Sequence, residues 1–366
     1  MYKKDYEFEN ITFTVQANNY EDFNSQLRHI SQFYISLSEF SNYSDKINIK
    51  YVVDVKLYEE LKNKIKGKKA RLYQSFENQI HAEYSMENNT KIYLIDTEEY
   101  ICIKYGDNDY ETITDGRKIS ERWLFRVVRE ILVRKNEEKK GLFMHGTGLV
   151  LEDQGILILG NSGAGKTTLA TRLLSGADCE KQFLSNDRVF LYSSGNESRM
   201  EYFPIPVVLA SGTVKNNLQL NEYFEKNNIY ENKTGKPFDE APDNAKIDIP
   251  LTDISEIFDK TSLIPIHKID LIIFSKLNLS NNDGLTSNYL SAHPREVGLS
   301  QTCFTTHDWE SLRMEWIYKR KIKHDQIIED RIVTLNNLSE SVPIIHLNFG
   351  VQTKTEDIVR LIKKYY

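Results

Sequence analysis

The chain has 366 residues, of which 40% are hydrophobic, so it is long enough for two domains and apolar enough to bury a core. This composition excludes wholesale disorder. A formal net charge of -6 argues against a general nucleic-acid binder, which carries a basic excess. Three cysteines without a CxxC pair show no metal-ligand spacing and favour a reduced, cytoplasmic setting.

The N-terminal sequence MYKKDYEFEN lacks the apolar stretch of a secretory signal. No window approaches the roughly 18 consecutive apolar residues of a membrane span, so we expect no membrane association. The basic run Lys62–Arg71 has two interpretations. A solvated helix end or loop is favoured over a surface that docks an acidic partner.

Residues 1–118 predict an α+β module. The expected elements, in chain order, are a strand over 7–15, an amphipathic helix over 20–40, a strand over 51–55 and a helix that ends near 65. From Arg71 to Thr114, short alternating segments are separated by the turn-forming sequences ENN and GDND, which predicts an antiparallel meander. No catalytic motif occurs here, so we interpret the module as a lid, an oligomerisation surface or a partner-recognition surface.

Residues 119–366 predict a second, α/β domain that opens with a helix over 120–139. The further elements expected are strands over 142–151 and 156–159, a loop over 160–165, a helix over 166–175, a strand over 183–192, a surface excursion over 215–248, a strand over 269–274, a helix over 308–320, a strand over 344–347 and a helix over 355–366. Their order predicts a central mixed sheet with a loop at the C-terminal end of one strand.

One segment matches the phosphate-loop pattern G-x-x-x-x-G-K-[ST] at every fixed position. It follows the apolar run ILIL and precedes TLATRLL, which is the strand–loop–helix setting that the motif requires. Glycines let the backbone N–H groups turn toward phosphate oxygens, and the helix adds the positive end of its dipole. The residues predicted to bind a purine nucleoside triphosphate are Gly160, Asn161, Ser162, Gly163, Ala164, Gly165, Lys166, Thr167 and Thr168.

Within this loop, Lys166 is expected to reach the β- and γ-phosphates of ATP, and the Thr167 hydroxyl to ligate Mg²⁺. Two polar segments flank the loop in sequence. Met144-His145-Gly146 lies in the strand expected to pair with ILIL, and Asn186-Asp187-Arg188 interrupts the apolar strand after the loop helix. A carboxylate inside an apolar strand is costly unless something binds it, which favours a functional role for Asp187.

These residues resemble the catalytic domain of the HPr serine kinase/phosphorylase family and its kinase-like relatives, including those of peptide natural-product clusters. That family has a histidine–glycine pair before its phosphate loop, and an acidic pair followed by Arg-Val after it. The matching positions here are His145-Gly146, Asn186-Asp187, Arg188-Val189 and the FPIP segment at 203–206. The resemblance covers 141–215 and extends more weakly to the strand VPIIHLNFG.

The resemblance implies an α/β fold in which a P-loop domain has an HPr kinase/PEP carboxykinase-like mixed sheet. It also implies a possible homo-oligomer. The chain departs from the family in three respects: Thr167-Thr168 replaces Ser-Glu, Asn186 replaces one acid, and the glycine- and arginine-rich C-terminal loop has no counterpart. These departures argue against HPr as the acceptor and against the reverse phosphorolysis.

Phosphoryl transfer assigns roles to the flanking residues. The γ-phosphoryl needs charge neutralisation by Mg²⁺ and Lys166, and the attacking hydroxyl needs a group that orients and deprotonates it. Asp187 is the candidate for that base, or for a second ligand of Mg²⁺ beside Thr167. His145 is expected to contact the γ-phosphate or to assist the base. Arg188 could neutralise phosphate, although strand alternation would point it away from Asp187.

Weaker candidates are Lys276, His293-Pro-Arg295 and His307-Asp308, which fit a surface strand end, turn or helix cap better than a site. We therefore expect an ATP- and Mg²⁺-dependent kinase acting on a hydroxyl of a peptide, protein or small molecule. The alternative is a nucleotide-binding ATPase or regulator without an acceptor, which the missing acid at Asn186 favours. No [NT]KxD sequence follows a strand, which makes a GTPase less favoured.

Overall fold

The computed structural model describes residues 1–8, 11–21, 23–24, 47–74, 80–87, 90–95, 100–105, 108–116, 123–194, 197–227, 241–280, 284–305 and 321–365. The chain forms two compact units. The first comprises Met1–Glu138 and Thr306–Ile322, and the second comprises Lys139–Thr305 and Lys323–Tyr366. Among the described residues, no helix combines the length and apolar character that a membrane crossing requires.

An eight-stranded sheet in the order β1-β2-β3-β8-β7-β6-β5-β4 forms the first unit. Its strands are β1 (Tyr2–Phe8), β2 (Ile11–Ala17), β3 (Ile47–Val53), β4 (Arg71–Gln74), β5 (Ile80–Ser85), β6 (Thr90–Ile95), β7 (Tyr100–Tyr105) and β8 (Asp109–Thr114). Strand β3 is parallel to both β2 and β8, and the strands from β4 to β8 pair antiparallel in succession. The predicted antiparallel meander is therefore confirmed.

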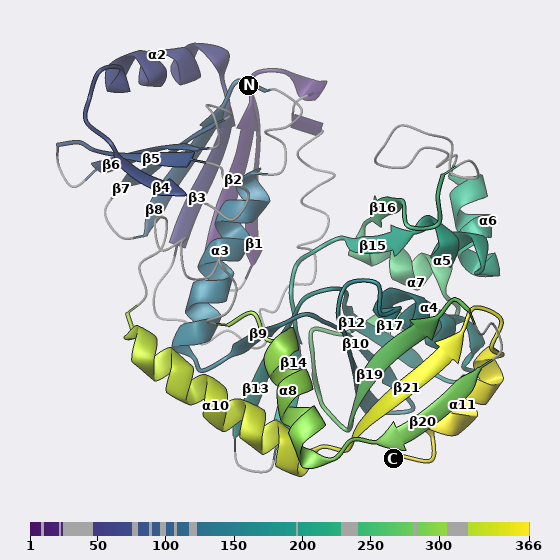
Figure 1. Ribbon diagram of the computed structural model, residues 1–366. Helices are drawn as coiled ribbons and strands as arrows, with labels where there is room; N and C mark the ends of the chain where they lie inside the picture. The colour runs from purple at the N-terminus through teal and green to yellow at the C-terminus, as the bar shows by residue number, and fades with distance from the viewer. Residues whose placement is uncertain are drawn as a thin grey trace. The chain divides into compact units, whose positions relative to one another are not determined.

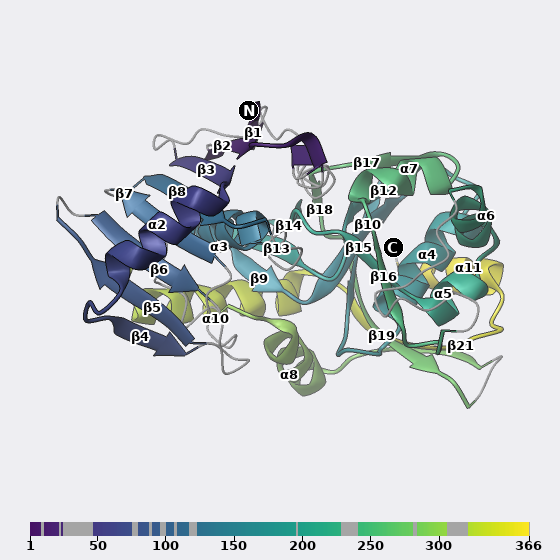
Figure 2. The ribbon, with the colours of Figure 1, turned by 90° about the horizontal axis from the view of Figure 1, so that it is seen from above.

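Helix α2 (Val55–Ile65) follows β3 directly and packs on this sheet (Figure 2). The carboxylate of Asp54 accepts a hydrogen bond from the backbone N–H of Leu57 and so caps the helix. The apolar face of the helix joins strand residues in a buried cluster of Val52, Tyr58, Leu61, Ile65, Ile92 and Ile113. A second helix of this unit, α3, spans Trp123–Glu138.

Three predictions for the first unit have different outcomes. The strand expected over 7–15 is wrong, because β1 and β2 form an antiparallel pair in which Phe8 lies opposite Ile11. The basic run begins in the last turn of α2, where Lys62 and Lys64 lie near the negative end of the helix dipole, as a solvated helix end predicts. Most of the helix expected over 20–40 lies outside the described residues.

The second unit contains a mixed seven-stranded sheet in the order β17-β12-β10-β11-β19-β21-β20 (Figure 1). Its strands are β10 (Gly146–Leu151), β11 (Gln154–Leu159), β12 (Lys181–Ser185), β17 (Thr261–Leu263), β19 (Leu271–Asn278), β20 (Leu285–Tyr289) and β21 (Ile344–Gly350). Strands β11, β19 and β21 are mutually parallel, whereas β10 is antiparallel to β11 and β12. The predicted α/β class with a mixed sheet is confirmed at this level.

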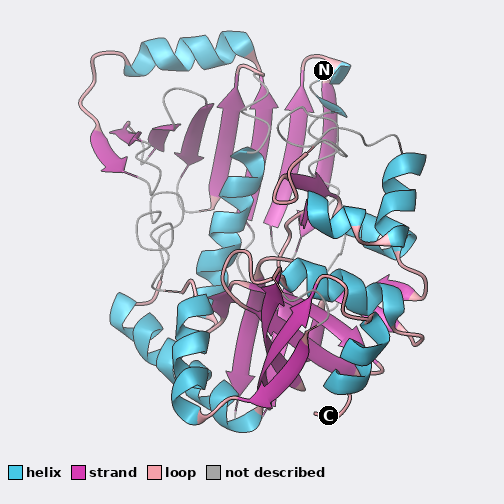
Figure 3. Ribbon diagram, turned by 45° about the vertical axis from the view of Figure 1, so that its right-hand side comes forward, coloured by secondary structure: helices cyan, strands magenta, loops and turns pink. Residues whose placement is uncertain are grey.

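Two smaller sheets complete this unit. The four-stranded sheet contains β9 (Leu142–Met144), β13 (Val189–Ser194), β14 (Glu197–Tyr202) and β18 (Ile266–Lys268), and the two-stranded sheet contains β15 (Val207–Ala210) and β16 (Lys246–Ile249). The helical segments are α4 (Lys166–Gly176), α5 (Ser211–Lys215), α6 (Leu218–Lys226), η3 (Leu251–Asp253), α7 (Ile254–Ile257), α8 (Ala292–Thr302), α10 (His324–Ser341) and α11 (Thr355–Ile362). Figure 3 shows helices covering the strands of this unit.

Two strands expected to be continuous are each divided between two sheets. The strand predicted over 142–151 is broken at His145, where the chain passes from β9 to β10. The strand predicted over 183–192 is broken at Asn186–Arg188, between β12 and β13. Because β9 pairs with β13 and β10 pairs with β12, the two breaks lie opposite each other. The polar residues at both positions therefore mark the junction of the sheets, and the prediction of unbroken strands is wrong.

Candidate functional site

The glycine-rich loop 160–165 connects β11 to α4, in the strand–loop–helix order that the sequence predicts. Gly163 and Gly165 have φ angles of 82° and 83°, which is the left-handed region that favours glycine. A Cβ on Gly165 would lie 2.7 Å from the Cβ of Leu277, so this position also lacks room for a side chain. The loop therefore brings backbone N–H groups and the N-terminus of α4 together, as an anion site requires.

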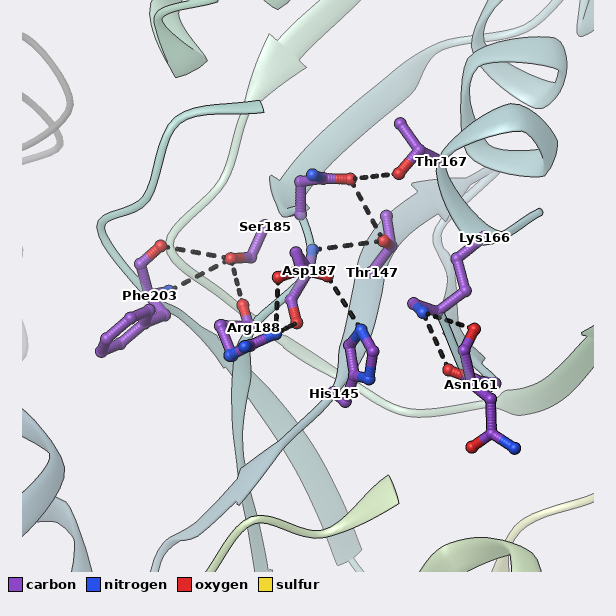
Figure 4. A network of polar contacts seen from close by, with 11 residues as sticks. His145, Thr147, Asn161, Lys166, Thr167, Ser185, Asp187, Arg188 and Phe203 are labelled. Atoms are coloured by element: carbon purple, nitrogen blue, oxygen red, sulfur yellow. Dashed lines mark hydrogen bonds and ion pairs between the residues drawn. The ribbon is translucent and has the colours of Figure 1, made fainter. Parts of the chain in front are cut away.

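Lys166 is the first residue of α4 and is only 7% exposed. Its Nζ donates hydrogen bonds to the carbonyl oxygen of Gly160 at 2.8 Å and to that of Asn161 at 3.3 Å (Figure 4). Burial lowers the pKa of Lys166 to about 8, and the negative charge of Asp187 opposes this shift. A buried ammonium group that is held mainly by neutral carbonyls is well placed to bind an anion.

Sheet topology brings the loop and the two polar breaks to one edge. Strand β10 is antiparallel to β11 and to β12, so the ends of β11 and β12 meet the beginning of β10. In the observed register, Gly146 lies opposite Leu159, and Gly148 lies opposite Ser185. His145, the glycine-rich loop and Asn186–Asp187 each follow or precede one of these strand ends, which places them side by side.

His145 and Asp187 form a hydrogen-bonded pair, with His145 Nε2 2.9 Å from Asp187 Oδ1. Arg188 Nη1 donates to the other carboxylate oxygen, Oδ2, at 2.5 Å (Figure 4). The guanidinium of Arg188 also lies 4.3 Å from the ring centroid of Phe304, and this ring stacks on His145. The expectation that Arg188 points away from Asp187 is therefore wrong. Asp187 has a φ of 61° at the strand break, so side-chain alternation does not hold there.

These contacts shift both pKa values of the pair. Burial would raise the pKa of Asp187, but the hydrogen bond from His145 and the charge of Arg188 hold it well below the ordinary value of a carboxyl group. Burial also lowers the pKa of His145, although its contact with Asp187 opposes the change. At neutral pH the pair is therefore a carboxylate and a neutral imidazole. Because the carboxylate of Asp187 can only accept a hydrogen bond, Nε2 of His145 carries the proton and Nδ1 of His145 has a lone pair.

Asn186 directly precedes Asp187 in the chain and is 1% exposed. Its Oδ1 accepts hydrogen bonds from the hydroxyls of Thr167 at 3.1 Å and Thr147 at 3.3 Å. Its buried Nδ2 has no hydrogen-bond partner among the described residues. An unsatisfied buried donor costs about 1–3 kcal/mol, so this amide marks a place where an acceptor from a ligand or water would be stabilising.

A cavity of about 540 Å³ joins these groups. Of the predicted loop residues, Ser162, Gly163, Gly165, Lys166, Thr167 and Thr168 line it, as do His145, Asn186 and Asp187. Gly160, Asn161 and Ala164 do not line it, although two of them hold Lys166 through their carbonyls. Its volume is in the range of ligand sites, about 300–1,000 Å³.

Some cavity residues were not predicted from sequence. Arg172 on α4, Thr213 on α5 and Lys246 on β16 all line the cavity, and the Thr213 hydroxyl lies 2.8 Å from that of Thr168. Lys246 falls in the segment 215–248 that was expected to be a surface excursion. Its short alternating sequence KIDI was the available indication of a strand. Thr147, which bonds Asn186, had no sequence signal at all.

The weaker candidates lie elsewhere. Lys276 is exposed in β19 and does not line the cavity. The segment His293–Arg295 forms the start of α8, whereas His307-Asp308 and the whole helix predicted over 308–320 lie outside the described residues. Within the described residues, Cys179 and Cys303 are free, and no three His, Cys, Asp or Glu residues are grouped as a metal site.

The oxygen donors beside the loop fit a hard divalent cation nevertheless. Mg²⁺ commonly uses one or two protein oxygens together with phosphate oxygens and water, so it does not require a full protein cage. The hydroxyl of Thr167 and the carboxylate of Asp187 line the same cavity and match this donor set. A site rich in thiols or imidazoles would instead indicate a softer metal.

Comparisons with known proteins give little further information. No protein-family model and no curated protein matches the chain. Among solved structures, the Hpr(Ser) kinase/phosphatase from Coxiella burnetii is similar, with 12% sequence identity and a TM-score of 0.28. The match covers 61% of this chain and 94% of that one.

Proposed function

We propose that the protein is an ATP-dependent phosphotransferase that moves the γ-phosphoryl group to a hydroxyl of a peptide, a protein or a small molecule. The proposal rests on one observation: two different kinds of group line the same cavity. One is a glycine-rich loop with the buried Lys166, and the other is the hydrogen-bonded pair of His145 and Asp187. The first suits a polyphosphate, and the second suits the removal of a proton.

The loop residues bind and orient the nucleotide in this proposal. Backbone N–H groups of 160–165 and the N-terminus of α4 contact phosphate oxygens. The ammonium of Lys166 exchanges its carbonyl contacts for the β- and γ-phosphates, and the orphaned Nδ2 of Asn186 gains an acceptor. Thr167 and Asp187 would hold Mg²⁺, which when bound supplies charge neutralisation for the triphosphate.

His145 is the better proton acceptor of the pair. Asp187 is held ionised by two donors, so it is a weak base, whereas the neutral imidazole has a free lone pair on Nδ1. The acceptor hydroxyl gives its proton to Nδ1 while its oxygen forms a bond to the γ-phosphorus. The bond from that phosphorus to the bridging oxygen breaks, and its electron pair leaves with ADP. The carboxylate of Asp187 stabilises the imidazolium that results.

The test is phosphoryl transfer from γ-labelled ATP with Mg²⁺ to a library of peptides that contain Ser or Thr, read by mass spectrometry. Lys166→Ala and Asp187→Ala should each lower transfer by about a hundredfold or more. Lys276→Ala removes an exposed lysine that does not line the cavity and should leave transfer unchanged. Undiminished transfer in both cavity variants would contradict the proposal.

One observation favours a second candidate function. Asn186 is an amide at a position where the family that the chain resembles has a carboxylate, and it is buried against Thr147 and Thr167. A site with one acid fewer fits a nucleotide-dependent ATPase or regulator that has no phosphoacceptor. Release of phosphate from ATP that depends on Lys166, with no peptide or small molecule modified, would select this function instead.

A further inference from the structure

The residues that line the cavity are polar on one side of strand β11 and apolar on the other. Strands β12 and β10 lie on one side of β11, and β19 and β21 lie on the other. The residues from the β10–β12 side are polar, namely His145, Asn186 and Asp187. The residues from the β19–β21 side are apolar, namely Leu277, Leu279 and Val351. The glycine-rich loop after β11 lies between the two groups.

The apolar side includes one aliphatic side chain, that of Leu279, which is highly exposed to solvent. Leu279 follows β19 directly and is 74% exposed, yet it lines the cavity. Leu277 and Val351 are half-buried beside it, at the ends of the neighbouring parallel strands. Three aliphatic side chains at the open end of a polar site form a surface on which a flat ring can pack.

We propose that this apolar end is the subsite for the nucleobase, packed on Leu277, Leu279 and Val351, and that it takes adenine in preference to guanine. The inference rests on the proposed function, because the triphosphate is placed by Lys166 and the loop. A ligand with a polyphosphate at one end and a ring at the other matches the order of the lining, which is polar toward β10 and β12 and aliphatic toward β19 and β21.

Asn216 supplies the discrimination between bases. It follows α5 and lines the cavity. Its Nδ2 donates a hydrogen bond to the carbonyl oxygen of Gly212 at 2.7 Å, which fixes the orientation of the amide and leaves Oδ1 free to accept. The exocyclic amino group of adenine is a donor, whereas the corresponding oxygen of guanine is an acceptor that would oppose Oδ1.

The first test compares ATP with inorganic triphosphate, both with Mg²⁺, by calorimetry on the full chain. The unaltered protein should bind ATP at least about tenfold more tightly, because only ATP has a ring to bury. Leu279→Ser should weaken ATP about tenfold and leave triphosphate unchanged. Leu72→Ser is the matched control, since Leu72 is 65% exposed in β4 and does not line the cavity.

The second test compares ATP with GTP. The unaltered protein should favour ATP about tenfold, and Asn216→Ala should bring the two affinities within about twofold of each other. Equal binding of ATP and triphosphate by the unaltered protein, or an ATP-to-GTP ratio that Asn216→Ala does not change, would overturn the inference. These outcomes differ from failure of the proposed function, in which ATP binds through Lys166 but no acceptor is phosphorylated.

Discussion

Lys166 shows how much a single buried charge affects this molecule. Its ammonium is enclosed at the start of α4, and its hydrogen-bond partners within the described part of the chain are two carbonyl oxygens. Burial disfavours the charged form, so the folded chain binds this proton less tightly than the unfolded chain does. The folded chain therefore contains a buried charge that lowers its stability and that an anionic ligand would stabilise.

A pH dependence of stability follows. Because burial lowers the pKa of Lys166 from 10.5 to about 8, the unfolded chain binds more protons between these values, and the free energy of unfolding rises with pH in that window. The slope contributed by one group is at most about 1.4 kcal/mol per pH unit. Lys166→Met should remove this part of the slope. Denaturant unfolding from pH 7 to 11 measures how the free energy of unfolding of each protein changes with pH. The same pH dependence in both proteins would contradict the prediction.

The pair of His145 and Asp187 gives a second prediction at this scale. The contact with Asp187 raises the pKa of His145 against the effect of burial. Asp187→Asn keeps the shape of the side chain but removes its charge, so the pKa of His145 should fall further below its ordinary value. An NMR titration of the imidazole tests this without any acceptor substrate. A pKa that stays the same or rises would show that the two side chains do not interact in solution.

At the scale of elements, the glycine-rich loop depends on positions that exclude a side chain. Gly165 combines a φ of 83° with close contact to Leu277, whereas Gly67 has a φ of 76° and open space around it. Gly67→Ala should lower the free energy of unfolding by about 1–2 kcal/mol through backbone strain alone. Gly165→Ala should cost about 1–3 kcal/mol more, because the new methyl group overpacks the loop.

Denaturant unfolding of both glycine variants checks these values, and nucleotide binding adds an independent measurement. Gly165→Ala should also lose ATP binding because the loop backbone has to move, whereas Gly67→Ala should keep it. If the two variants were equally stable and bound ATP equally well, the close contact at Gly165 would have no structural importance.

Element boundaries were less predictable than element types. The segments 142–151 and 183–192 were each predicted as one strand, because the periodicity of the apolar residues does not show where a chain passes from one sheet to another. The breaks at His145 and at Asn186–Arg188 exist because β9 and β13 pair in one sheet while β10 and β12 pair in another. The same feature invalidates the alternation argument that placed Arg188 away from Asp187.

At the scale of the whole molecule, the cavity belongs entirely to the unit formed by 139–305 and 323–366. Binding of Mg²⁺ and ATP should therefore slow amide hydrogen exchange in that unit, most strongly at 160–168 and 185–188. A ligand at about one hundred times its Kd stabilises the state it binds by about 2.7 kcal/mol. Exchange measured by mass spectrometry with and without nucleotide tests this, and protection confined to 1–138 would contradict it.

The sequence by itself determined the features that depend on neighbouring residues. These are the α/β class, the order of strand, loop and helix around Gly160–Thr168, the glycines with left-handed backbone, and the lysine at the helix start. Each follows from local backbone geometry or from the periodicity of one element, which adjacent residues specify.

Tertiary structure alone decided which side chains meet. His145 and Asp187 are 42 residues apart, and their contact depends on the pairing of β10 with β12. The bond from Thr147 to Asn186 and the apolar wall at Leu279 have the same origin, since strand order in a sheet is set by the packing of the whole unit. Local sequence specifies the backbone of each element, and only the assembled sheet specifies the distances between the groups that make the site.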